Sequence, residues 1–160
     1  MIDLAKARQS LNEMQLLKLS TAAKILKNTA SIFAELSMHP SKSSLLPLWA
    51  AGVITHGQPN TRFFEVGITQ AALDATPRDR TKDHLFRVTA TAELILSKAT
   101  DLSEAEIEDL LLARSLKMVT TRQENHSTLK KALKSCLNKD DWQELYMRAG
   151  VKYQLHQAPP

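Results

Sequence analysis

A chain of 160 residues is long enough for one domain with its own hydrophobic core and too short for two ordinary domains. Hydrophobic residues make up 43% of the chain and charged residues 24%, which is typical of a globular protein. The chain has only four glycines, which argues against a sheet-rich fold with many tight turns. The net charge of +4 favours an anionic partner without identifying it. We therefore expect a predominantly helical fold of the α+β class.

Cysteine usage and hydropathy exclude several classes of protein. The single cysteine, Cys136, lies in an apolar-periodic run, so the sequence predicts a small core residue and excludes an internal disulfide or a four-cysteine zinc site. No stretch approaches the ~20 apolar residues of a membrane span, and the N-terminus lacks the apolar block of a secretory signal. We expect a cytoplasmic protein that does not contact a membrane.

The first third of the chain is predicted to be helical. Apolar residues recur at helical spacing over residues 4–36, which predicts one long helix or two helices broken near residues 19–21. The polar stretch "MHPSKSS" ends this region. A short apolar segment, "LLPLWAAGVI", follows, in which Trp49 is expected to anchor the core, and "THGQPNT" is predicted to be a second loop.

The middle of the chain is predicted to contain two strands around a helical pair. The segment "RFFEVGIT" carries strand-forming residues with partial alternation of sides, whereas "QAALDATPRDRTKDH" carries turn residues and charges and is predicted to be a loop that ends in Asp83 and His84. Two helices follow, "VTATAELILSKA" and "LSEAEIEDLLLARS", the second starting with a capping box of Ser103 and Glu106. The run "LKMVTT" is the second candidate strand.

The last third is predicted to begin with a capped helix. Thr121 and Glu124 form a second capping box before "RQENHSTLKKALKSCL", whose inner stripe is expected to be Leu129, Ala132, Leu133, Cys136 and Leu137. Counting back four from Leu129 puts Asn125 on the inner face of the first turn. A short helix with Trp142 and Tyr146 as core anchors should follow, stop at Gly150 and lead into an extended tail.

Most catalytic motifs do not occur in this sequence. There is no G-x-x-x-x-G-K-[ST] or G-x-G-x-x-G phosphate loop, no G-x-S-x-G elbow and no H-E-x-x-H zinc signature. The Asp83-His84 pair remains, flanked by arginines and lysines. Taken alone, such a dipeptide is most often a turn residue beside a solvated or core-lining histidine.

The order of the elements around Asp83-His84 resembles that of a known family. A strand, a segment ending in Asp83-His84, the strand "KMVTT" and a helix whose first turn holds "ENH" together resemble the ββα-metal nucleases, also called HNH endonucleases. In addition, "VTTRQENHSTLKK" is similar to the "VT..EN..L" segment of phage-type variants, and "DWQELYMRAGVKY" to a "W..LY..AGI" tail. The resemblance implies that Asp83 and Asn125 are metal ligands and that His84 is the general base, with His126 as the substitute for Asn125 in a shifted register.

The residue types suit this chemistry. Carboxylate and amide oxygens are hard ligands for Mg²⁺ or Mn²⁺, and a neutral imidazole can take a proton from an attacking water. Basic residues that could contact the DNA backbone flank the site or line the last long helix, although such residues are more often simply solvated. They are Arg78, Arg80, Lys82, Arg87, Arg122, Lys130, Lys131 and Lys134.

We therefore expect an N-terminal helical region, residues 1–58, and a nuclease-like region, residues 59–160, with an inserted helical pair. The expected function is metal-dependent hydrolysis of DNA phosphodiester bonds in a bacterial or phage-infected cell. The alternative is a non-enzymatic helical DNA-binding or protein-interaction module in which Asp83-His84 is a structural turn. The amphipathic N-terminal helices could form a homodimer, clamp DNA or cap the core.

Overall fold

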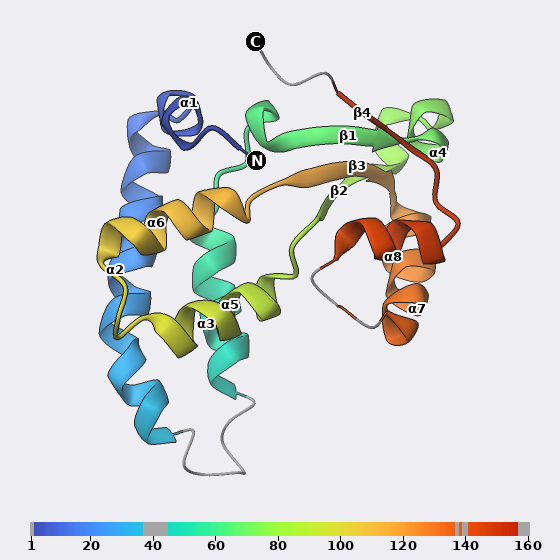
Figure 1. Ribbon diagram of the computed structural model, residues 1–160. Helices are drawn as coiled ribbons and strands as arrows, with labels where there is room; N and C mark the ends of the chain where they lie inside the picture. Colours follow the sequence, from blue (N-terminus) through green and yellow to red (C-terminus); the bar gives the residue numbers. More distant parts are fainter. Residues whose placement is uncertain (1, 37–44, 137, 139–140, 157–160) are drawn as a thin grey trace. The chain divides into compact units, whose positions relative to one another are not determined.

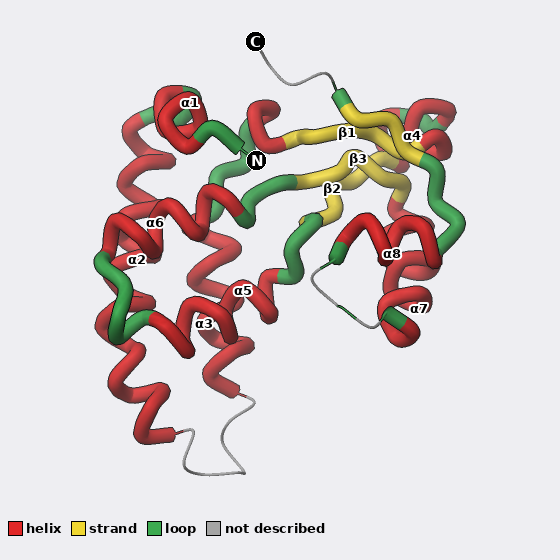
Figure 2. The backbone as a smooth tube through the Cα atoms, in the orientation of Figure 1, coloured by secondary structure: helices red, strands yellow, loops and turns green. Residues whose placement is uncertain are grey.

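The chain forms two compact units, each assembled from two separate segments (Figures 1 and 2). The computed structural model describes residues 2–36, 45–136, 138 and 141–156. The first unit comprises Met1–Thr61 and Val88–Ser115, and the second comprises Arg62–Arg87 and Leu116–Pro160. The helical pair expected as an insertion in the nuclease-like region therefore packs with the N-terminal helices.

The first unit is entirely helical in its described part. It contains α1 (Leu4–Gln9), α2 (Glu13–Leu36), α3 (Leu45–Gly57), α5 (Val88–Lys98) and α6 (Glu104–Ala113). Helix α2 packs against α3, α5 and α6, and α3 packs against α5 (Figure 1). Its buried apolar side chains recur every three or four residues along each helix, which gives each helix one inward face. The largest fully buried ones are Leu19, Leu26, Ile54, Ile95, Ile107, Leu111 and Leu112.

Two predictions for the N-terminal helices are wrong. The break lies between Gln9 and Glu13 rather than near residues 19–21, because Asn12 and Gln15 cap the start of α2 by exchanging backbone-to-side-chain hydrogen bonds of 2.9 and 3.0 Å. Trp49 is not a core anchor, since it lies on α3 with 47% of its surface exposed. The apolar segment is long enough for a complete helix, and only part of that helix faces the core.

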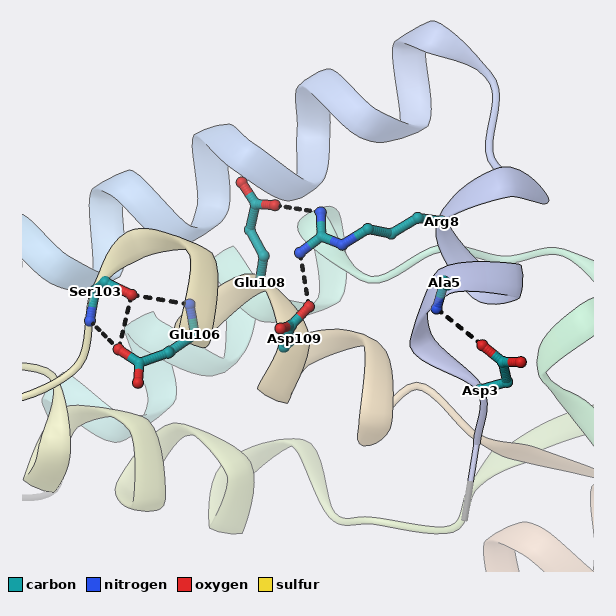
Figure 3. Close-up of polar contacts among 7 residues, drawn as sticks. All are labelled: Asp3, Ala5, Arg8, Ser103, Glu106, Glu108 and Asp109. Carbon is teal, nitrogen blue, oxygen red and sulfur yellow. Dashed lines mark hydrogen bonds and ion pairs between the residues drawn. The ribbon is translucent and has the colours of Figure 1, made fainter.

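Polar contacts fix the ends of the helices in the first unit (Figure 3). The Arg8 guanidinium on α1 donates to Glu108 at 2.6 Å and to Asp109 at 2.7 Å, which ties α1 to α6. The predicted capping box is confirmed: Ser103 Oγ accepts from the backbone N–H of Glu106, and the Glu106 carboxylate accepts from the backbone N–H of Ser103. These bonds satisfy donors that the helix itself leaves unpaired.

The second unit is built on a small mixed sheet of four strands in the order β2-β3-β1-β4. The strands are β1 (Glu65–Thr69), β2 (Arg80–His84), β3 (Lys117–Thr121) and β4 (Tyr153–Leu155). The helical elements are η1 (Arg62–Phe64), α4 (Gln70–Asp74), η2 (Pro77–Asp79), the π-helix η3 (Glu124–Leu129), α7 (Lys130–Ala132), η4 (Leu133–Ser135) and α8 (Trp142–Arg148). The predominantly helical α+β class is thus confirmed.

The register of the sheet decides which side chains share a face. Strand β3 pairs parallel with β1 and antiparallel with β2, and Asp83 lies opposite Met118 while His84 lies opposite Lys117. Directly opposed residues of an antiparallel pair point to the same face, and consecutive residues point to opposite faces. Asp83 therefore shares a face with Met118 and, two residues along β3, with Thr120.

Predictions for the second unit are mostly confirmed. The strand "KMVTT" forms β3, the Thr121–Glu124 capping box is present, and Gly150 ends α8 with a φ of 66°. The prediction of a loop over "QAALDATPRDRTKDH" is wrong, because this segment contains α4 and β2. Strand β2 has the sequence RTKDH, which shows no apolar alternation, and it is defined by its hydrogen bonds to β3.

The core of the second unit lies between one face of the sheet and the helices η3 and α8. Leu85, Met118, Leu129 and Tyr146 are buried together there, with Trp142 and Tyr153 packed against them. Tyr146 is thus confirmed as a core anchor. Cys136 is buried and unpaired, as predicted, and Leu137 lies outside the described residues.

Two glycines of α3 provide a matched test of helix packing in the first unit. A Cβ at Gly57 would overlap the Cβ of Ala22 on α2, whereas a Cβ at Gly52 would meet no atom within 4 Å. We expect Gly57→Ala to lower the free energy of unfolding by about 1–3 kcal/mol through overpacking. Gly52→Ala should raise it by about 0.5–1 kcal/mol through helix propensity. Urea denaturation measures both, and equal stabilities of the two variants would contradict the close approach of α2 and α3.

Candidate active site

Asp83 is a partly buried acid that is hydrogen-bonded by a tyrosine 63 residues later in the chain. The Tyr146 hydroxyl on α8 donates a hydrogen bond of 2.9 Å to Asp83 Oδ2, and Tyr146 is fully buried. Burial raises the pKa of Asp83 to about 6, and the hydrogen bond from Tyr146 opposes this increase. Asp83 therefore changes charge close to neutral pH, which is common for carboxyl groups at functional sites.

Three aromatic rings hold the Tyr146 hydroxyl in place. The ring of Tyr146 meets Trp142 edge-to-face at 6.0 Å and Tyr153 edge-to-face at 5.6 Å, and the Trp142 and Tyr153 rings lie 5.5 Å apart. Each such pair contributes about 0.5–1.5 kcal/mol beyond burial. The ring has little freedom to turn, so packing sets the position of its hydroxyl oxygen beside Asp83.

His84 is the last residue of β2 and points to the other face of the sheet, beside Lys117. Its Nδ1 is buried and has no hydrogen-bond partner among the described residues. Burial and, to a smaller extent, the nearby Lys117 charge lower the pKa of His84 to about 4. At neutral pH the imidazole is uncharged, which is the form that can accept a proton.

A row of charged side chains lies beside His84 on this face. Lys117 is only 5% exposed, and its pKa is lowered by burial and by Lys82 and raised by Glu65. Glu65 pairs with Lys82 at 2.5 Å. Burying an ammonium group costs free energy even with an acid nearby, so Lys117 lowers the stability of the fold at this position.

The π-helix η3 is fixed at its start by a carboxylate that accepts three hydrogen bonds. Glu124 Oε2 accepts from Thr69 Oγ1 at 2.7 Å, from the Thr121 backbone N–H at 2.9 Å and from Thr121 Oγ1 at 3.1 Å. Asn125 follows immediately and is half-buried. Leu129, about one turn later, packs with Met118, so η3 lies on the face of the sheet that carries Asp83. Single π-turns are rare and frequently occur at functional sites.

The types of oxygen donor on this side of the sheet are those that a magnesium-like ion prefers. Asp83 and Asn125 offer oxygen atoms, and Thr120 Oγ1 is buried on the same face without a hydrogen-bond partner among the described residues. Nowhere in residues 2–36, 45–136, 138 and 141–156 do three His, Cys, Asp or Glu side chains form a metal-binding group. Mg²⁺ needs no such group, because it binds through one or two protein oxygens and keeps several waters.

The predicted DNA contacts divide into two groups. The Arg80 guanidinium donates to the carbonyl oxygens of Leu73 and Ala75, and Lys82 pairs with Glu65, so both side chains already make contacts within the unit. Arg87 is half-buried. The remaining predicted side chains are exposed, and so is His126; they are Arg78, Arg122, Lys130, Lys131 and Lys134.

The sequence did not identify two residues of the site. Tyr146 was expected only to fill the core, yet a tyrosine rather than a phenylalanine in a core position indicates that its hydroxyl has a partner. Lys117 opens β3 directly before the apolar pair Met118 and Val119, and a lysine is rarely buried without an acid nearby. Neither signal names the partner, because Asp83 precedes Tyr146 by 63 residues.

A shallow apolar groove of about 350 Å³ lies on the first unit, lined by residues of α2 and α3 such as Leu17, Ile25, Val53 and His56. Several exposed apolar side chains extend along α2, including Met14 and Ile32. None of the predicted site residues lines this groove. The homodimer that the sequence suggests as one possibility for the N-terminal helices would place these exposed side chains of α2 in its interface. It stays a prediction.

Comparison with protein-family models, with curated proteins and with solved structures gives no match for this chain. In the described part of the chain, no helix combines the length and the apolar character needed to cross a membrane. The candidate site therefore rests on its own geometry and chemistry.

Asp83 and His84 give the free energy of unfolding opposite dependences on pH. The pKa of Asp83 rises from 3.8 to about 6 on folding, so between these values the folded chain binds more protons at this carboxyl and stability falls as pH rises. The pKa of His84 falls from 6.5 to about 4, so the unfolded chain binds more protons at this imidazole and stability rises with pH. The two slopes oppose each other in the wild-type chain.

When either residue is replaced, the dependence of the free energy of unfolding on pH should show the contribution of the other residue alone. We expect the free energy of unfolding of Asp83→Asn, measured relative to wild type, to increase by about 1–3 kcal/mol as pH rises from 4 to 6. For His84→Gln, the same difference should decrease by a similar amount. Urea unfolding at a series of pH values measures both difference curves. Difference curves of the same sign would show that one of the two groups is not buried as described.

Proposed function

We propose that this protein is a metal-dependent endonuclease of the ββα-metal type that hydrolyses DNA phosphodiester bonds. One observation carries the proposal: β2 ends in Asp83-His84 and pairs antiparallel with β3, and β3 leads directly into the helix that bears Asn125. Leu129 packs that helix onto the face of Asp83. The segment ending in Asp83-His84, expected from the sequence to be a loop, is strand β2, and it shares one sheet with β3 and one core with the helix.

The proposed mechanism gives each side chain a separate task. Asp83 and Asn125 would hold Mg²⁺ or Mn²⁺ through oxygen atoms. The bound ion would stabilise negative charge on the phosphate and on the leaving oxygen. His84, uncharged at neutral pH, takes the proton of the attacking water on a ring nitrogen.

The position of the scissile bond follows from the pleat of β2. Asp83 and His84 leave the strand on opposite faces, so they can act on one phosphodiester only where the strand ends. His84 is the last residue of β2, and the positive charge of Lys117 lies beside it. We therefore place the phosphate at the carboxyl end of β2, where Lys117 can contribute to its neutralisation.

The second candidate function is that of a non-enzymatic module that binds either DNA or another protein. The observation that favours DNA binding is a set of exposed cationic side chains just before η3 and in α7 and η4. They could follow a phosphate backbone, and they are Arg122, Lys130, Lys131 and Lys134. In this function Asp83 and His84 have structural roles, and their placement on opposite faces needs no further explanation.

A plasmid assay separates the two candidates. Supercoiled DNA is incubated with the protein in Mg²⁺, Mn²⁺ or chelator, and nicked and linear products are measured. We expect cutting that needs the cation and falls by about 10²–10⁴-fold in His84→Ala, because the general base is lost. Asn125→Ala should require more Mg²⁺ for the same rate, while His156→Ala, an exposed histidine outside the site, should cut like wild type. Equal cutting by His84→Ala and wild type would exclude His84 as the base.

The basic helix makes a prediction that holds for either function. Replacing Lys130, Lys131 and Lys134 together by alanine should weaken DNA binding and reduce the slope of log affinity against log salt by about 2–3, because each phosphate contact releases counterions. Fluorescence anisotropy at several salt concentrations, with uncut DNA in chelator, measures the slope. An unchanged slope would remove this helix face from the DNA contact.

A further inference from the structure

The bond between Tyr146 and Asp83 joins the proposed metal ligand to the best-packed part of the unit. The donor lies on α8, whose start is capped by Asp141 and whose end is set by Gly150. The acceptor lies on β2, two residues before the buried Leu85. Both ends of the bond are therefore anchored in one core, and the 2.9 Å distance is a property of that core.

The hydroxyl occupies only one of the two carboxylate oxygens. Tyr146 donates to Oδ2, and no other described side chain or backbone group donates to the Asp83 carboxylate. A hydrogen bond to one oxygen restrains the rotation of the carboxylate and leaves the second oxygen, Oδ1, to accept a cation. Hydrogen bonds of this kind orient the ligands of metal sites, and removing them commonly costs 10–100-fold in metal affinity.

We propose that Tyr146 is a positioning residue that orients Asp83 for binding the divalent cation through Oδ1. This inference rests on the proposed function, and it assigns to the C-terminal helix a part in the site beyond filling the core. Tyr146 itself touches neither the cation nor the DNA. The rival explanation is that the bond only satisfies a buried hydroxyl, in which case its loss would change stability and leave metal binding unaltered.

Two phenylalanine substitutions provide a matched pair. Tyr146→Phe keeps the ring that packs against Trp142 and Tyr153 and removes the hydrogen bond to Asp83. Tyr153→Phe removes a hydroxyl from a neighbouring ring of the same cluster and leaves the bond to Asp83 in place. A difference between these variants therefore reports on the bond rather than on aromatic packing.

The test measures Mn²⁺ binding by the full chain without DNA, from the loss of the free Mn²⁺ signal in electron paramagnetic resonance near neutral pH. We expect Tyr146→Phe to bind Mn²⁺ about 10-fold more weakly than wild type, or weaker still, and Tyr153→Phe to bind within about twofold of wild type. In the cleavage assay, Tyr146→Phe should need correspondingly more Mn²⁺ for half-maximal rate and keep most of the rate at saturating Mn²⁺. Circular dichroism establishes that each variant is folded.

The outcomes distinguish this inference from the proposed function. Mn²⁺ binding that is lost in Asp83→Asn but unchanged in Tyr146→Phe overturns the positioning role alone. Equal weakening in Tyr146→Phe and Tyr153→Phe overturns it too, because packing would then be the cause. No Mn²⁺ binding by wild type, or equal binding by wild type and Asp83→Asn, overturns the metal site and the positioning role together. If Tyr146→Phe does not fold, a rise in the Mn²⁺ needed by Trp142→Phe, which loosens the ring, supports the role, and an unchanged requirement overturns it.

Discussion

The pairing of β3 with both of its neighbours is the constraint on which the second unit depends. Strand β3 is hydrogen-bonded to β2 on one side and to β1 on the other, and its register sets which side chains reach the helices. A slip of one residue would turn Met118 away from the core and Asp83 away from Tyr146, since neighbouring residues of a strand face opposite sides. The burial of Met118 against Leu129 and Tyr146 therefore holds the register and the candidate site together.

The ionisable groups of the candidate site lie where their burial lowers the stability of the fold. Asp83, His84 and Lys117 all have pKa values moved by burial in the direction that disfavours their charged forms. Groups of this kind lower stability unless packing and hydrogen bonds offset the loss of hydration. For Asp83, the aromatic cluster around Tyr146 supplies packing and a hydrogen bond. A chain selected only for stability would carry apolar residues at these positions, which is why we interpret them functionally.

Much of the helical structure could be predicted from the sequence, for a local reason. The capping boxes at Ser103–Glu106 and Thr121–Glu124 are bonds between residues three apart, so the chain carries both partners within one turn. Strand β2 and the exposure of Trp49 could not be predicted in the same way. Five polar residues become a strand only when β3 offers them hydrogen bonds, and whether one tryptophan on an apolar helix faces inward depends on which neighbours cover that helix.

By itself the sequence determined most of the helices, the two capping boxes, the strand "KMVTT" and the position of Asn125 in the first turn after it, because all of these depend on contacts within a few residues. The tertiary structure alone decided that α5 and α6 pack with the N-terminal helices, that Asp83 and His84 face opposite sides of the sheet, and that Tyr146 binds Asp83. These outcomes depend on strand register and on residues far apart in the chain. Such contacts exist only once the core has formed, so no local pattern specifies them.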